Sequence, residues 1–152
     1  MPLLDFLDPR AVLPALRVNG KKQALQELAS HAARLTGVSD TAIYEALLQR
    51  ERLGSTGIGE GIAIPHGKLP GLTRIFGLIA RLEKPVDFEA LDAQPVDVLF
   101  LLLAPEGAGA DHLKALARVA RVLREPGLIE RVRVTRDAAA LYAIMTELPK
   151  AA

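Results

Sequence analysis

The chain has 152 residues, of which 50% are hydrophobic and 24% are charged, as is typical of one soluble globular domain. With 19 basic and 18 acidic residues, its net charge of +1 provides no general attraction to nucleic acid. The chain has no cysteine, which excludes a disulfide framework and a thiolate zinc site.

The first third of the chain predicts one extended segment followed by two helices. Residues 11–18 are apolar, and their single proline favours an edge or irregular strand. Apolar residues then recur at helical spacing over residues 21–36. A second helix is expected to begin at Ser39 or Asp40, either of which can cap it, and to end near Leu53.

The middle of the chain predicts a loop and several strands. Residues 54–61 contain four glycines, and we expect them to form a loop. Residues 62–64 are a short strand-like run that ends at a Pro-His-Gly sequence. Residues 75–82 and 96–104 are apolar enough to be buried strands, and residues 84–94 form a polar connection between them.

The last third predicts three helices. Asp111 is expected to cap a helix that runs to Arg124. The apolar face of that helix is predicted to consist of Leu113, Leu116, Ala117, Ala120 and Leu123. A short helix over residues 128–132 should follow, and Asp137 should begin the last one. The inward face of this last helix is predicted to carry Leu141, Ile144, Met145 and Leu148. Because helices and strands interleave, we expect an α/β fold with a central sheet in one domain, residues 1–152.

The sequence predicts a cytoplasmic protein that does not insert into a membrane. The N-terminus lacks a basic segment followed by an apolar run, so it does not resemble a signal peptide. The longest apolar stretch, residues 98–104, is far shorter than the roughly 20 residues of a membrane span.

His66 is the residue whose surroundings most suggest chemistry. It follows the glycine-rich segment and a short apolar strand, and it lies between Pro65, which restricts the backbone, and Gly67, which allows close approach to the main chain. An exposed nucleophile is typically placed at such a position, although a turn histidine without a task has the same pattern. His31, inside the first helix, is interpreted as an ordinary helix residue.

The glycine-rich segment offers donors for an anion but matches no nucleotide-binding motif. The Ser55 and Thr56 hydroxyls and amides such as that of Gly57 could turn toward a phosphate, and the bland alternative is a flexible connection. Arg50 and Arg52 end the preceding helix, where an arginine fork suits phosphate and a solvated helix end is the alternative.

His112 follows the expected cap and should lie in the first helical turn, where amides attract anions and the imidazole stays neutral. With His66 it could instead suggest a metal-dependent hydrolase. We expect no metal, because the two histidines are 46 residues apart and no close His/Asp cluster supplies further ligands.

Residues 50–69, RERLGSTGIGEGIAIPHGKL, resemble the active-site signature of the fructose/mannitol-type enzyme IIA domains of the bacterial phosphoenolpyruvate-dependent phosphotransferase system. Within that family they are most similar to the nitrogen-regulatory enzyme IIA, and the resemblance continues through residues 94–100 and the His112-Leu113 helix start. It implies a mixed sheet flanked by helices on both faces. Glu60 stands where nitrogen-class relatives often have Asn.

The resemblance implies roles for individual residues. His66 would be the phosphoryl acceptor, Arg50 would assist the phosphoryl group and His112 would be the second active-site histidine. Ser55, Thr56, Gly57, Gly67, Arg52 and Lys68 are the expected phosphate-binding or partner-binding residues. A backbone carbonyl is the simplest acceptor that could fix the His66 tautomer.

The resemblance also implies the partners and the type of activity. The donor would be an HPr-like phosphocarrier, and the activity that of a transferase with a phosphohistidine intermediate and no cofactor. The targets would be regulatory proteins linked to nitrogen or potassium transport, and a weak homodimer is compatible with the sequence. The alternatives are a fructose/mannitol uptake component and a ligand-gated binding module without phosphoryl chemistry. For docking, an apolar rim is expected from Ile58, Ile62 or Leu69.

Overall fold

The computed structural model describes residues 2–147. Its elements are η1 (Leu3–Asp5), β1 (Leu7–Leu16), α1 (Lys21–Thr36), α2 (Asp40–Arg52), β2 (Gly57–Gly59), β3 (Ile62–Ala63), β4 (His66–Leu69), β5 (Phe76–Val86), β6 (Val96–Pro105), α3 (Ala110–Leu123), α4 (Leu128–Arg133) and α5 (Ala138–Thr146). The interleaved helices and strands confirm the predicted α/β class.

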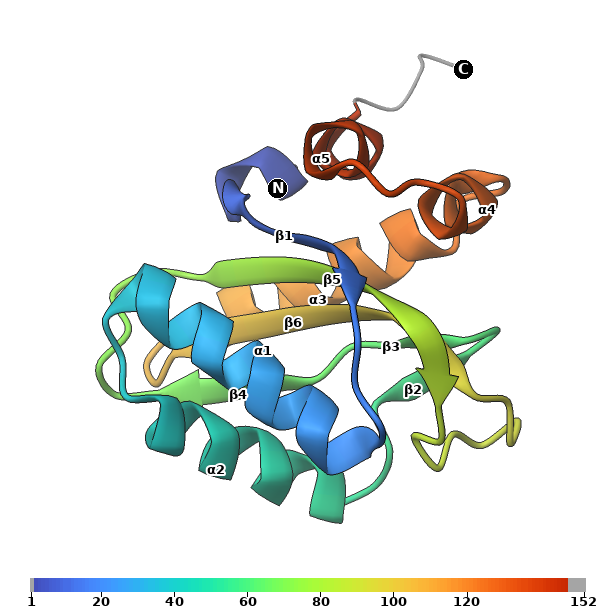
Figure 1. Cartoon of the computed structure of the whole chain (residues 1–152). Coiled ribbons are helices and arrows are strands. Elements are labelled where there is room, and N and C mark those ends of the chain that lie inside the picture. The colour runs from blue at the N-terminus through green and yellow to red at the C-terminus, as the bar shows by residue number, and fades with distance from the viewer. Residues whose placement is uncertain (1, 148–152) are drawn as a thin grey trace.

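The strands form one mixed sheet in the order β1-β5-β6-β3-β2, with β4 also paired to β6. The central strands β5 and β6 are antiparallel, whereas β1 runs parallel to β5, and β3 and β4 run parallel to β6. Figure 1 shows α1 and α2 on one face of this sheet and α3 on the other. The predicted mixed sheet with helices on both faces is therefore confirmed, and its apolar side chains belong to one core cluster.

Most of the predicted boundaries are confirmed. Helix α1 covers the predicted residues, and Gly37 ends it in the left-handed conformation, with φ of 79°, that favours glycine. The Ser39 hydroxyl accepts from the Ala42 amide and caps α2, and Asp137 caps α5 in the same way. Strand β1 lies at the sheet edge as predicted, although it begins four residues earlier, at Leu7. Of the predicted inward face of α5, Leu148 lies outside the described residues.

Two short strands were not predicted, and both lie near the glycine-rich segment. Residues 57–59 were expected to be loop, but they form β2, which pairs with β3 through a two-residue turn at Glu60-Gly61. Both turn residues have positive φ, 58° and 82°, which matches the twist that a tight hairpin requires. His66 was expected to follow a strand, but it begins β4 and pairs with Leu102.

Helix α3 differs from its prediction in its cap and in its buried face. Its N-cap is Gly109 rather than Asp111, so Asp111 lies inside the first turn. The buried residues are His112, Ala115, Val119, Val122 and Leu123, whereas Leu113 and Ala117 are exposed. The predicted apolar face is wrong at Leu113 and Ala117, because α3 packs against the sheet with His112 facing inward. Its other members are confirmed: Leu123 is buried, and Leu116 and Ala120 pack against the core. His112 is one of the candidate site residues, and this orientation of α3 buries it.

Candidate functional site

Three elements that are separated in the sequence bring Arg50, His66 and His112 together. Arg50 lies in the last turn of α2, His66 begins β4 and His112 lies in the first turn of α3. Arg50 Nε lies 3.2 Å from His66 Nε2, and the centroids of the two imidazole rings are 5.7 Å apart. The structure thus places the three residues that the sequence singled out in one site.

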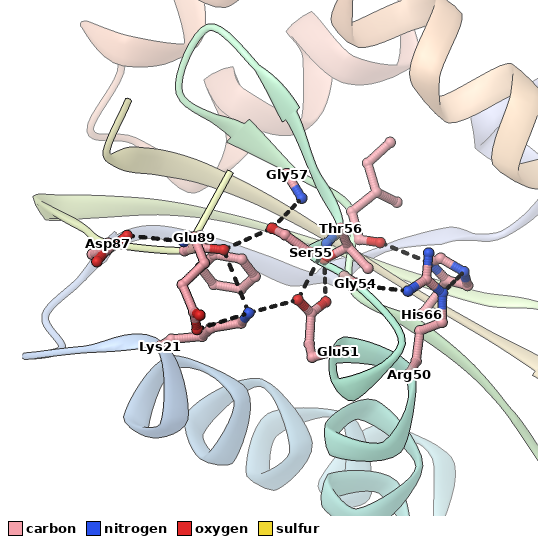
Figure 2. A network of polar contacts seen from close by, with 12 residues as sticks. Lys21, Arg50, Glu51, Gly54, Ser55, Thr56, Gly57, His66, Asp87 and Glu89 are labelled. Carbon is pink, nitrogen blue, oxygen red and sulfur yellow. Dashed lines mark hydrogen bonds and ion pairs between the residues drawn. The ribbon is translucent and has the colours of Figure 1, made fainter. Parts of the chain in front are cut away.

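The tautomer of His66 is fixed by the backbone two residues before it. Its Nδ1 lies 2.8 Å from the Ile64 carbonyl oxygen, and because a carbonyl only accepts, Nδ1 donates its proton there. The lone pair is therefore on Nε2, where Arg50 Nε donates to it. The expected backbone carbonyl acceptor is confirmed, and Figure 2 shows the Arg50 side chain directed at this ring.

His112, which lines the site, has a buried ring nitrogen without a hydrogen-bond partner in the described part of the chain. The residue is only 6% exposed, and its Nε2 has no hydrogen-bond partner among residues 2–147. Buried polar atoms are nearly always satisfied, so an orphan beside a second imidazole indicates a missing ligand. Its position in the first turn of α3 adds the partial positive charge of a helix N-terminus.

Both imidazoles have pKa values below the ordinary value. Burial is the main cause for His66; the Ile64 hydrogen bond raises its pKa, the Arg50 guanidinium lowers it and the Glu51 carboxylate raises it. Burial is also the main cause for His112, followed by the charges of His66 and Lys68, and all three lower its pKa. The two rings are therefore neutral near pH 7, and His66 Nε2 is free to act as a nucleophile.

The lowered pKa of His66 predicts how the site responds to acid. His66 should titrate below about 6.5, the value of a free imidazole, so the neutral form should persist as pH falls from 8 to that value. Because the unfolded chain binds this proton more readily than the folded chain, the free energy of unfolding should decrease as pH falls below about 6.5. Ring-nitrogen NMR of the folded chain, with the urea-unfolded chain as control, measures this. If His66 in the folded chain titrated at the same pH as in the unfolded chain, or at a higher pH, the prediction would be contradicted.

Two cavities meet at His66, and together they contain every residue expected at the site. The larger, about 630 Å³, is lined by Ala46, Gln49, Arg50, Arg52, Leu53, His66, Gly67, Lys68 and His112. The smaller, about 240 Å³, is lined by Arg50, Ser55, Thr56, Gly57, Ile58, Ile64, His66, Leu116 and Ala120. Arg50 and His66 are common to both cavities. Arg52 and Lys68 are exposed and lie at the outer side.

The loop hydroxyls are used inside the protein. The Ser55 hydroxyl donates to the Phe88 carbonyl at 2.6 Å and accepts from the Gly57 amide. The Thr56 hydroxyl donates to the buried Glu51 carboxylate. The absent side chain of Gly67 lets Ala46 of α2 approach β4, since an added Cβ would lie 3.3 Å from the Ala46 methyl. These contacts hold the loop and α2 against the rings.

Two details of the site correct or complete the sequence analysis. Ile62 and Leu69, expected on an apolar rim, are 1% and 2% exposed. Ile58 is half-buried and lines the smaller cavity, whereas the exposed leucines next to site residues are Leu53, which lines the larger cavity, and Leu113, which follows His112 in α3. Glu60 is at the exposed hairpin turn, where its amide donates to Asp92, and it lines neither cavity.

Residues 2–147 also bear on metal binding and on membrane insertion. No group of three or more His, Cys, Asp or Glu side chains in that range is arranged to hold a metal ion. No helix in that range is long and apolar enough to span a bilayer.

Comparison with known proteins decides the family. Residues 5–148 match the family model described as "Phosphoenolpyruvate-dependent sugar phosphotransferase system, EIIA 2". The chain belongs to this EIIA family. A "Nitrogen regulatory protein" of Bradyrhizobium diazoefficiens is 61% identical to it over 152 residues, all of this chain and 99% of that protein. The protein of the same name from Escherichia coli K12 is 39% identical over 148 residues, 97% of this chain and 91% of that protein.

Solved structures show the same EIIA fold. "Nitrogen Regulatory Protein IIA-Ntr" from Neisseria meningitidis superposes with a TM-score of 0.89 at 33% identity, covering 95% of this chain and 99% of that one. The IIA mannitol protein of Escherichia coli has a TM-score of 0.77 at 18% identity, covering 91% and 97% of the two chains. The second likeness concerns the fold alone.

Proposed function

We propose that this EIIA protein carries a phosphoryl group on Nε2 of His66 and acts as a regulatory member of the phosphotransferase system. The observation that carries the proposal is the Nε2 lone pair of His66, fixed by the Ile64 carbonyl and facing Arg50, with the His112 ring centroid 5.7 Å from that of His66. Among residues 2–147, no carboxylate side chain lines either cavity, so a phosphoryl dianion meets Arg50, Arg52, Lys68 and the two imidazoles there without an acidic neighbour. The activity is that of a transferase with a phosphohistidine intermediate.

Transfer requires little covalent chemistry from the protein. As the donor's nitrogen–phosphorus bond breaks, its imidazole keeps the bonding electrons, and the His66 lone pair forms the new bond while Nδ1 keeps its proton. Charge spreads over the three phosphoryl oxygens in a loose transition state. Before the new bond forms, Arg50 turns its Nε–H from His66 Nε2 to a phosphoryl oxygen, which frees the lone pair, and His112 donates to another phosphoryl oxygen. Arg52 and Lys68 attract the incoming group from the cavity rim.

Names of relatives support the nitrogen class over sugar uptake. Relatives called nitrogen regulatory proteins are 61% and 39% identical to this chain, whereas a fructose-specific EIIABC component and a fructose-specific EIIA component are 30% and 32% identical to it. We therefore assign it a regulatory role, with targets linked to nitrogen or potassium transport. A cytoplasmic location and a weak homodimer stay predictions.

The proposed donor is an HPr-like phosphocarrier that docks over the larger cavity. Leu53, which lines that cavity, and Leu113, which follows the cavity residue His112, are 85% and 68% exposed, and exposed leucines suit a carrier's contact surface. Replacing both by Ser should raise KM for the carrier about tenfold, the effect of losing roughly 1.4 kcal/mol of docking energy.

A small phosphoryl donor separates docking from chemistry in this double variant. Transfer from phosphoramidate should be unchanged, because that donor needs no protein contact. Leu91 is fully exposed in the loop between β5 and β6, so Leu91→Ser is the matched control. A KM that stays at the wild-type value in the double variant would place the docking surface elsewhere.

The position of the phosphoryl group tests the proposed function. Incubation with phosphoenolpyruvate, enzyme I and the HPr-like carrier should give one acid-labile phosphoryl group per chain. NMR of the phosphorylated ring should place it on Nε2, because Nδ1 is occupied by the Ile64 carbonyl. A ligand-gated binding module would show no mass increase, and attachment at Nδ1 would contradict the proposed tautomer.

A further inference from the structure

The carboxylate of Glu51 is buried next to Arg50 and takes no direct part in the proposed phosphoryl transfer. Glu51 follows Arg50 in the last turn of α2, and its side chain is only 3% exposed. Burying an ionised carboxylate is costly unless cations and hydrogen bonds compensate it. Its partners therefore indicate what this residue holds in place.

Both carboxylate oxygens of Glu51 are bound to the loop that follows α2. Oε1 accepts from the Thr56 amide at 3.2 Å, and Oε2 accepts from the Thr56 hydroxyl. The contacts between Glu51 and Thr56 thus hold together the two ends of the intervening segment, residues 52–55. The carbonyl of Gly54, within that segment, accepts from Arg50 Nη1 at 2.9 Å. The arginine that reaches His66 is therefore oriented by a carbonyl whose place depends on Glu51.

Oε1 of Glu51 also binds Lys21, the first residue of α1. Lys21 Nζ lies 2.9 Å from Glu51 Oε1, 5.0 Å from the centroid of the Phe88 ring and 3.4 Å from the Phe88 carbonyl. That carbonyl also accepts from the Ser55 hydroxyl. Figure 2 shows these contacts as one continuous network from Lys21 to His66. Three segments of the chain, including the loop after β5, thus fix the loop that carries Gly54.

We propose that Glu51, neutralised by Lys21, is a positioning residue for phosphoryl transfer: it holds residues 54–56 so that Arg50 stays aligned with Nε2 of His66. This inference rests on the proposed acceptor role of His66. Glu51 touches neither the ring nor the phosphoryl group. Its contribution is transmitted through the Gly54 carbonyl to the guanidinium, so it should vanish when the guanidinium is absent.

A double-mutant cycle with Arg50 tests this transmission. Glu51→Gln keeps the side-chain shape but loses the ion pair and one of the two acceptor oxygens. It should lower the rate at saturating HPr-like carrier about tenfold, and a rate at saturation does not depend on docking at the nearby Leu53. In an Arg50→Ala background the same change should have less than a twofold effect. Equal effects in both backgrounds would overturn the proposal.

Further measurements separate positioning from general damage. Glu45→Gln makes the same chemical change on the exposed side of α2 and should leave rate and melting temperature unchanged. The pKa of His66 should fall further in Glu51→Gln, because the Glu51 carboxylate raises it in the wild type. The other charged or titratable groups of the cavity remain, namely Arg50, Arg52, Lys68 and His112. A His66 titration identical to wild type would contradict this.

A second variant decides the question if Glu51→Gln does not fold. Thr56→Val removes the hydroxyl donor but keeps the Lys21–Glu51 ion pair, and it should slow transfer only while Arg50 is present. Thr56→Ser, which keeps the hydroxyl, should be slowed less. If Thr56→Val slows transfer by the same factor in the Arg50→Ala background as in the wild type, the inference is overturned. If His66→Ala still accepts phosphate in the same assay, the proposed function itself fails, which is a separate outcome.

Discussion

His66→Ala is expected to abolish phosphoryl acceptance completely. The nucleophilic lone pair is on Nε2 of this ring, and alanine provides no nitrogen in its place. The fold should remain, because the ring is half-buried at the start of β4 and the methyl group of alanine fits there without a clash. Mass spectrometry after incubation with the HPr-like carrier and phosphoenolpyruvate should show the single phosphoryl adduct in wild type and none in the variant.

Two further histidine variants make this result specific. His31, in α1, contacts Arg34 and Glu27 rather than the site, so His31→Ala should be phosphorylated like the wild type. His112→Ala should still be labelled, but slowly, because it loses a donor and not the acceptor. If His66→Ala retained the adduct while His112→Ala lost it, the assignment of acceptor and helper would be reversed.

Periodicity predicted most of the fold because most elements are long enough to show it. Helix α1 and strand β6 have many apolar residues at the expected spacing, and both are found where the pattern indicated. Strands β2 and β4 have only three and four residues, rich in glycine and polar groups, so they carry no alternation that could reveal them. Strand β2 pairs with β3 and β4 pairs with β6, and only the folded sheet provides these partners.

The site was predicted in part, and the missed parts follow from the geometry of its helices. The motif around His66 marked the acceptor, but the exposed Leu113 was expected in the core, because a helical pattern rich in leucine and alanine does not fix which face is buried. Glu51 carried an overlooked signal. It stands four residues after Leu47 and eight after Ile43, on the buried stripe of α2. A carboxylate that continues an apolar stripe indicates a buried, paired charge.

Arg50→Ala should slow phosphoryl transfer about 100-fold while leaving the fold intact. Removing one preorganised donor to developing charge typically costs about this factor in rate. Arg50 donates to His66 Nε2 at 3.2 Å in the free protein and is held there by the Gly54 carbonyl, so it needs little reorganisation when the phosphoryl group arrives. Rapid-quench kinetics at saturating carrier measures the transfer step separately from docking.

The variants around Arg50 distinguish its shape from its charge. Arg50→Lys keeps a cation but loses the planar fork, so it should recover only a small part of the rate. Arg17→Ala, which breaks an exposed ion pair with Glu83, is the matched control and should transfer normally. The pKa of His66 should rise in Arg50→Ala, because the guanidinium lowers it in the wild type. A higher pKa by itself makes the His66 ring a stronger base. If the transfer rate nevertheless falls strongly in Arg50→Ala, then Arg50 acts on the phosphoryl group rather than on the basicity of His66. A rate within twofold of wild type would remove Arg50 from the transition state.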